Sequence, residues 1–164
     1  MQHGAQFLTE NKGGSDVGAN AISATDNGDG TWRINGEKWF CSNADAKVVM
    51  LLARPEGAGP GTRGVGLFLM PRYLDDGSQN HYRIVRLKDK LGTRSMASGE
   101  IKLEGAIAYA VGKLDRGFVQ MAEMVNSSRL SNGVKSTALM RRSQRISMPV
   151  ATTLAACGRR GAVV

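Results

Sequence analysis

The chain has 164 residues, 41% of them hydrophobic and 22% charged, which supplies enough apolar side chains for a core and excludes wholesale disorder. It contains no apolar run of the roughly 18 residues that a membrane helix needs, and its first residues lack the basic and apolar regions of a signal peptide. Two cysteines, Cys41 and Cys157, are too few for a disulfide framework, so a reduced, cytoplasmic setting is expected.

The net charge of +8 belongs to the C-terminal part of the chain. Residues 124–164 hold no Asp or Glu, whereas residues 1–123 hold 15 basic and 14 acidic side chains. A basic segment attracts nucleic acid and anionic surfaces nonspecifically, but no aromatic residue is interleaved with these arginines. We therefore expect the exposed end of an incomplete helical region, and we keep nucleic-acid contact as the alternative.

The first two thirds of the chain are predicted to form strands. Short apolar or alternating runs occupy residues 6–9, 31–42, 47–53, 64–70, 81–87 and 99–103. Gly, Pro and Asp/Asn turn signals separate them, and residues 26–30, DNGDG, form the strongest of these signals. The pattern predicts five to seven strands and no helix before about residue 113, which indicates a mainly β fold, either a barrel or two packed sheets.

The pattern then changes to that of one long helix. Apolar residues recur at spacings of four, three and four at Leu114, Phe118, Met121 and Val125, and then at spacings of four at Leu130, Val134 and Ala138. Gly133 is tolerated, and Pro149 is expected to end the helix. The predicted domains are a β domain over residues 1–112, a helical region over 113–148 and an irregular tail over 149–164.

The stretch FLTENKGGSDVGAN, residues 7–20, is a glycine-rich loop after a strand. Glycines at 13, 14 and 18 allow backbone amides to point into one concavity, and Ser15 adds a hydroxyl donor. The stretch is neither a Walker loop nor a dinucleotide fingerprint. On spacing alone, both an ordinary loop and a phosphate cradle fit it.

The stretch INGEKWFCSN, residues 34–43, places two adjacent aromatic residues before a Ser-Asn pair. In a regular strand Trp39 and Phe40 face opposite sides, so one is expected to fill the core while the other offers a flat surface to a ligand ring. The alternative is that both rings only pack within the sheet.

Together these two motifs resemble the middle β domain of the acyl-CoA dehydrogenase flavoprotein family. The resemblance rests on T-E-x-x-G-G-S-D at residues 9–16 and G-x-K-W-F-x-S-N at residues 36–43. Residues 86–95, RLKDKLGTRS, are similar to a strand entry of that family, and with residues 72–80 they look closest to the subgroup related to the adaptive alkylation-response protein. Gly117-Phe118 followed by Arg129 resembles the start of the family's C-terminal helical bundle. The resemblance covers residues 4–142, and it implies a middle-domain-like barrel of two packed sheets.

The resemblance implies FAD as cofactor and acyl-CoA as substrate. The implied cofactor contacts are Leu8, Thr9, Gly14, Ser15, Phe40, Cys41 and Ser42. The implied substrate contacts are Ser15, Asn126 and Arg129. In the family's arrangement Thr9 lies at the pyrimidine side of the flavin, Phe40 packs on the ring and Ser42 bonds near the flavin atom N5, while Gly14 and Ser15 lie toward the pyrophosphate and the acyl-CoA.

The implied reaction is α,β-dehydrogenation of an acyl-CoA thioester, an oxidoreduction of fatty acid metabolism. A carboxylate removes the α proton while the β hydride passes to the flavin. No catalytic residue is assigned here, because Ser128 precedes Arg129 where some members have Glu and no acid follows Glu123. The chain looks like a truncated fragment with an altered ending, so its activity as an enzyme by itself is left open.

Three further expectations concern oligomerisation, an alternative function and metal binding. The apolar face of the long helix needs a cover, so either a homo-oligomer or a disordered tail is expected. The alternative function is a non-catalytic β module in binding or assembly, with nonspecific nucleic-acid contact through its basic region. No metal site is predicted, because His3 and His81 lack neighbours at ligand spacing.

Overall fold

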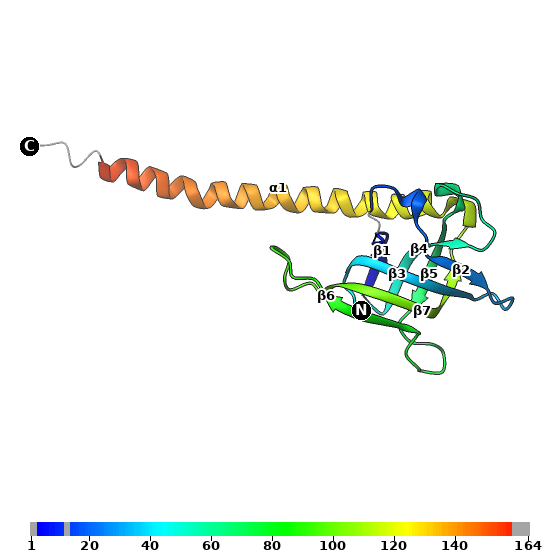
Figure 1. The fold of residues 1–164 in the computed structure, drawn as a ribbon. Helices are drawn as coiled ribbons and strands as arrows, with labels where there is room; N and C mark the ends of the chain where they lie inside the picture. The colour runs from blue at the N-terminus through cyan, green and yellow to red at the C-terminus, as the bar shows by residue number, and fades with distance from the viewer. Residues whose placement is uncertain (1–2, 12–13, 159–164) are drawn as a thin grey trace, which may run out of the picture. The chain divides into compact units, whose positions relative to one another are not determined.

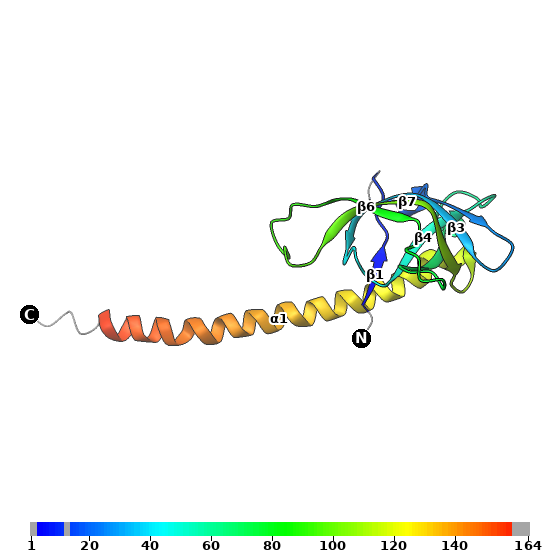
Figure 2. The ribbon, with the colours of Figure 1, turned by 90° about the horizontal axis from the view of Figure 1, so that it is seen from below.

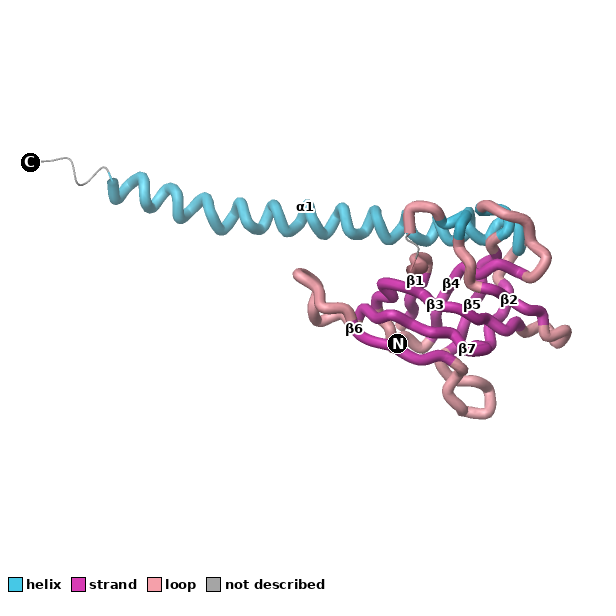
Figure 3. The backbone as a smooth tube through the Cα atoms, in the orientation of Figure 1, coloured by secondary structure: helices cyan, strands magenta, loops and turns pink. Residues whose placement is uncertain are grey.

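The computed structural model describes residues 3–11 and 14–158, and the side chains of these as far as residue 147. The strands are β1 (Gly4–Phe7), β2 (Ser23–Asp26), β3 (Trp32–Ser42), β4 (Val48–Pro55), β5 (Gly66–Pro71), β6 (Tyr82–Leu87) and β7 (Ser98–Ala110). Short 3-10 turns lie at η1 (Val17–Ala19), η2 (Thr62–Gly64) and η3 (Leu114–Arg116). The helix α1 (Gly117–Gly158) follows, as Figures 1 and 3 show.

Five strands close into a ring. The order is β4–β2–β3–β7–β5, and β5 pairs again with β4. β1 extends the sheet beside β4, and β6 pairs with the second edge of β7 (Figure 2). The expected β-barrel followed by a long helix is therefore confirmed. Closure pairs the edges of the ring strands, which removes the open edge that would otherwise template aggregation.

One side of each barrel strand fills the interior. All seven strands contribute to the core, and its largest fully buried apolar members are Phe7, Ile34, Leu51, Phe68, Met70, Ile101 and Leu103. Trp32 packs against the ring of Phe68, with centroids 5.4 Å apart. The alternation seen in the sequence thus puts apolar side chains inside and most charged ones outside, as the period of two requires. Lys38 on β3 and Glu100 on β7 are buried exceptions.

The strand β2 is absent from the runs that the sequence predicted. Its residues, SATD, include one core side chain, Ala24, and the strand pairs with both β3 and the end of β4. The predicted turn after it is present, because Gly28 and Gly30 adopt φ of +79° and +87°. Asp26 and Asp29 accept hydrogen bonds from Gly28 N and Thr31 N at 2.8 and 2.9 Å, which fixes the hairpin between β2 and β3.

The chain divides into two compact units, Met1–Ala122 and Glu123–Val164. The first turns of α1 thus belong to the β unit, where Met121 is fully buried. In the second unit α1 exposes Leu130, Val134, Leu139, Met140 and Ile146. Among the described residues, no helical stretch combines the length and apolar character that crossing a bilayer would require.

The prediction that Pro149 ends the helix is wrong. α1 continues to Gly158, so residues 149–158 are helical rather than irregular. A proline removes one backbone donor and crowds the preceding turn, but the neighbouring hydrogen bonds can carry a long helix across it. The rest of the predicted tail, residues 159–164, lies outside the described residues.

The buried and exposed leucines of the β unit provide a matched test of the core. Leu51 is fully buried on β4 and Leu91 is fully exposed in the loop before β7. Leu51→Ala is expected to lower the free energy of unfolding by about 2–5 kcal/mol, because it leaves a cavity. Leu91→Ala is expected to change it by less than about 0.5 kcal/mol. Chemical denaturation measures both, and equal effects would contradict the described core.

Candidate functional site

Three direct hydrogen bonds join the two sequence motifs. Trp39 N on β3 donates to the Thr9 carbonyl oxygen at 2.8 Å. Lys38 Nζ donates to the Leu8 carbonyl oxygen at 3.2 Å and to Glu10 Oε1 at 3.0 Å. Residues 8–10 are therefore held along β3, next to the position of the aromatic pair.

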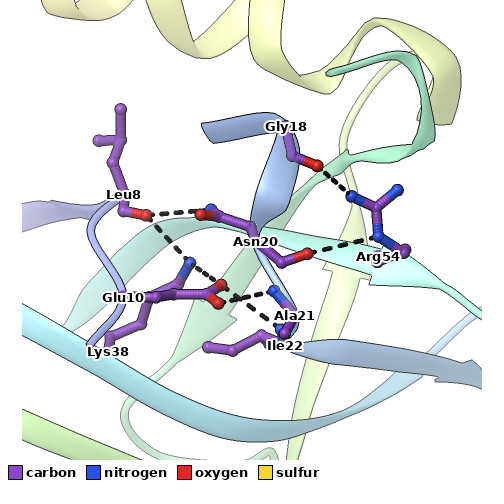
Figure 4. A network of polar contacts seen from close by, with 8 residues as sticks. All are labelled: Leu8, Glu10, Gly18, Asn20, Ala21, Ile22, Lys38 and Arg54. Carbon is purple, nitrogen blue, oxygen red and sulfur yellow. Dashed lines mark hydrogen bonds and ion pairs between the residues drawn. The ribbon is translucent and has the colours of Figure 1, made fainter. Parts of the chain in front are cut away.

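Lys38 and Glu10 form an ion pair, which Figure 4 shows among its polar neighbours. The pair is buried, since Lys38 is 1% exposed and Glu10 is 8% exposed. Glu10 also accepts hydrogen bonds from Ala21 N at 2.7 Å and Ile22 N at 3.4 Å. Burial lowers the pKa of Lys38, and the charge and hydrogen bond of Glu10 act against that lowering. The carboxylate thus binds three separate segments of the chain together.

The far end of the glycine-rich loop is fixed by a second polar group. Asn20 Nδ2 donates to the Leu8 carbonyl oxygen at 3.1 Å. Arg54 on β4 donates through Nε to the Asn20 carbonyl oxygen at 3.3 Å and through Nη2 to the Gly18 carbonyl oxygen at 2.7 Å (Figure 4). The described ends of the loop, residues 8–10 and 18–20, are therefore tied to β3 and β4.

A bulge in β3 determines how the two aromatic residues lie. Lys38 pairs with Ile101 and Cys41 with Gly99, so three steps along β3 match two along β7. Phe40 adopts φ of +57°, which is rare for an aromatic residue, and its side chain is 55% exposed. The expectation that one of the two rings fills the core is wrong, since Trp39 is half-buried and the interior positions belong to Lys38 and Cys41.

The Trp39 ring is covered by a cation that sequence reasoning missed. Lys88 Nζ lies 3.0 Å from the Trp39 ring centroid and 5.1 Å from that of Phe40. Glu100 on β7 binds Lys88 and also accepts from Arg86 Nε at 2.6 Å. Burial acts to raise the pKa of Glu100, but these two hydrogen bonds and their charges lower it overall. No local pattern links residue 100 to residue 39.

Two of the predicted contacts carry hydroxyl groups, Ser42 two residues after Phe40 and Thr9 on the segment that is hydrogen-bonded to Trp39. Ser42 is exposed and its Oγ lies 3.1 Å from Ser98 Oγ. Thr9 is half-buried, and a Cβ placed on Gly14 would lie 2.9 Å from Thr9 Oγ1. Only glycine therefore allows this close approach of the loop to Thr9.

The remaining predicted positions differ in their environment. Ser15 is exposed, and its side chain has no hydrogen bond to another described residue. The Cys41 side chain is 1% exposed and faces the core, so any ligand contact there would use its main chain. Gly13, part of the predicted phosphate-binding loop, lies outside the described residues.

We call residues 8–10 and 39–42 the site wall. Chemically, the site wall offers the flat ring of Phe40 together with the hydroxyl groups of Ser42 and Thr9. A planar ring bearing acceptor atoms is the kind of ligand that such a surface fits. The family model described as acyl-CoA dehydrogenase, middle domain, matches residues 5–106. The chain belongs to the acyl-CoA dehydrogenase family.

Individual members of the acyl-CoA dehydrogenase family agree with this assignment. Acyl-CoA dehydrogenase family member 11 of Caenorhabditis elegans is 41% identical over 143 residues, covering 84% of this chain and 23% of the relative. AidB of Escherichia coli (strain K12) is 38% identical over 135 residues, covering 82% and 24%. The crystal structure of Caenorhabditis elegans ACDH-11 in complex with C11-CoA superposes with a TM-score of 0.75 at 38% identity, covering 81% and 23%.

The chain spans about a quarter of the length of the curated relatives it matches. The family resemblance is thus confirmed, while the predicted site residues stay predictions. Two of the three predicted substrate contacts, Asn126 and Arg129, are exposed one turn apart on α1 in the second unit. Within the described residues, no group of three or more His, Cys, Asp or Glu side chains is placed to hold a metal ion.

The Lys38–Glu10 pair should be the most costly polar contact to break. Glu10→Gln leaves a buried ammonium without its counter-charge, so we expect a loss of about 3–5 kcal/mol in the free energy of unfolding. Lys38→Met should cost less, because Glu10 keeps its two backbone donors. Chemical denaturation measures both changes.

A surface pair provides the matched control for this experiment. Glu104 accepts from Arg83 Nε at 3.3 Å, and both side chains are exposed. Glu104→Gln should therefore change the free energy of unfolding by no more than about 1 kcal/mol. The interpretation fails if Lys38→Met destabilises the protein as much as Glu10→Gln does.

Cys41 should be an unreactive thiol in the folded protein. Burial raises its pKa to about 12, although the charge of Lys38 acts in the opposite direction. At pH 8 the thiolate fraction is then about 10⁻⁴, so alkylation of native Cys41 should be negligible and should become rapid on unfolding. Peptide mass spectrometry after iodoacetamide treatment distinguishes it from Cys157. Rapid labelling of Cys41 in the native protein would contradict its core position.

Proposed function

We propose that this chain forms the FAD- and acyl-CoA-binding wall of an acyl-CoA dehydrogenase-type oxidoreductase. The observation that carries the proposal is the Phe40 ring, exposed at a bulge in a left-handed backbone conformation. Such a conformation costs about 1–3 kcal/mol, and residues that keep it cluster at ligand sites. A ring presented in this way, two residues before Ser42 and next in the chain to Trp39, which bonds the Thr9 carbonyl, suits one face of a flavin.

The residues present fit the cofactor that the family implies. Phe40 would pack on the flavin ring, and the Ser42 and Thr9 hydroxyls would hydrogen-bond atoms at its edge. Gly14 lacks the Cβ that would collide with Thr9, so the loop can lie close to that edge. FAD, when bound, would supply the acceptor for a hydride from the β carbon of an acyl-CoA. Cys41 would contribute only through its main chain.

The proposal also covers the substrate, the catalytic base and the assembly. We propose acyl-CoA as substrate, with Ser15, Asn126 and Arg129 as its contacts in this chain. No residue here is proposed as the base that takes the α proton. A homo-oligomer is proposed from the apolar side chains that α1 exposes in its own unit. A role in fatty acid metabolism and a cytoplasmic location remain predictions.

The Phe40 ring provides a direct test of the proposed flavin site. The purified chain is expected to take up added FAD and to gain the visible absorption of a bound flavin. Phe40→Ala should weaken FAD binding by about fivefold, because aromatic pairs contribute roughly 1 kcal/mol beyond burial. Phe40→Trp should keep or improve the affinity. Titration of flavin fluorescence measures all three dissociation constants.

A second exposed aromatic residue provides the control. Tyr73 is 51% exposed and lies in the segment between β5 and β6. Tyr73→Ala should leave the FAD dissociation constant unchanged. Uptake of FAD that is insensitive to Phe40 but lost on Tyr73→Ala would place the ligand elsewhere on the β unit and overturn the proposed site.

A further inference from the structure

A hydrogen-bond relay of three polar side chains, Lys90, Ser98 and Ser42, ends at the exposed hydroxyl of Ser42. Ser42 Oγ lies 3.1 Å from Ser98 Oγ, and Lys90 Nζ lies 3.0 Å from that same Ser98 oxygen. Ser98 is 3% exposed, whereas Ser42 is exposed and Lys90 is half-buried. The hydrogen-bond relay therefore runs from the Lys90 ammonium, through the buried Ser98 hydroxyl, to Ser42, two residues from the exposed Phe40.

The cation fixes the direction of the first hydrogen bond. An ammonium group has three donors and no acceptor. Lys90 Nζ donates to the Met96 carbonyl oxygen at 2.7 Å, to Ser98 Oγ at 3.0 Å and to Thr93 Oγ1 at 3.4 Å. All three donors are thus used, two of them within the loop before β7, and Ser98 at the start of β7 must accept.

Burial then fixes the direction of the second hydrogen bond. The Ser98 hydroxyl proton needs an acceptor, and among the described residues Ser42 Oγ is the one within reach. If Ser42 donated instead, a buried donor would be left without a partner, which is the costly arrangement. Ser98 therefore donates to Ser42, and the hydroxyl proton of Ser42 is directed away from Ser98.

We propose that Lys90 and Ser98 are positioning residues that set Ser42 as a hydrogen-bond donor toward the N5 acceptor atom of the oxidised flavin ring. This inference rests on the proposed FAD site and adds the polarity of one contact within it. The positive charge of Lys90 polarises the Ser98 hydroxyl, and successive hydrogen bonds in such a chain strengthen one another. Lys90 and Ser98 thus act on the ligand through Ser42 alone.

The test compares FAD with 5-deaza-FAD, in which a C–H group replaces N5. Flavin titrations of the full chain give both dissociation constants. The wild-type chain should bind FAD about fivefold tighter than 5-deaza-FAD, which is the worth of one net hydrogen bond. Ser42→Ala should abolish this preference, and Ser42→Thr should keep it. Ser98→Ala and Lys90→Met should reduce it to about twofold or less.

The preference, and not the affinity itself, is the diagnostic quantity. Lys90→Met also removes a positive charge that could attract the phosphates of either flavin. The matched control is Lys135→Met, which removes the same charge from an exposed position on α1 and should keep the fivefold preference. Thermal melts confirm that each variant is folded, and Lys90→Met tests the inference if Ser98→Ala does not fold.

Each outcome decides between the two proposals. If FAD binds without a preference over 5-deaza-FAD, or if the preference persists in both Ser98→Ala and Lys90→Met, the inference is overturned and the proposed FAD site stands. If the wild-type chain binds neither flavin, the proposed function is overturned and the inference with it. Loss of the preference in Ser98→Ala and Lys90→Met, with retention in Lys135→Met, supports the inference.

Discussion

The geometry of this β unit depends on one buried ion pair. Lys38 is a strand residue whose side chain points into the barrel, and a buried ammonium is tolerated only beside a counter-charge. Glu10 supplies that charge from a loop 28 residues away, and its carboxylate also binds the amides that follow the loop. The same pair that satisfies Lys38 therefore holds residues 8–10, the start of the glycine-rich loop, against β3. A buried pair of this kind contributes position more than it contributes net stability.

The bulge in β3 determines which ring of this segment is exposed to a ligand. Lys38 and Cys41 both occupy interior positions, so one extra residue between them has to be accommodated outside the ladder. Phe40 takes up the extra step in a left-handed conformation, and its ring is directed outward as a result. Trp39, beside it, is screened by Lys88 and the Glu100 network. Strain and local charge are thus concentrated where the wall is proposed to meet its ring-shaped ligand.

The sequence predicted most of the barrel because the strands that fill its core are apolar runs with turn signals between them. It missed β2, since SATD has one core side chain and gains its structure from the strands on either side. The sequence predicted a helix end at Pro149 because proline lacks a backbone donor and usually breaks a helix. In the structure the hydrogen bonds of the neighbouring turns continue the helix to Gly158. The prediction for Trp39 and Phe40 failed for a related reason, because strict alternation does not anticipate a bulge whose register is set by β7.

By itself the sequence determined the family, the mainly β fold and the two motifs that line the proposed site, because these depend on residue types at short spacings. Only the tertiary structure decided how the motifs meet and which groups support them. Glu10 pairs with Lys38, and Lys88 lies over the Trp39 ring. Ser98 hydrogen-bonds both Ser42 and Lys90. The partners in these contacts are too far apart in the sequence, or too irregularly spaced, for a local pattern to predict them. The physical reason is that buried charges and hydroxyls must find partners wherever the chain brings them together, and closure of the barrel decides which partners are within reach.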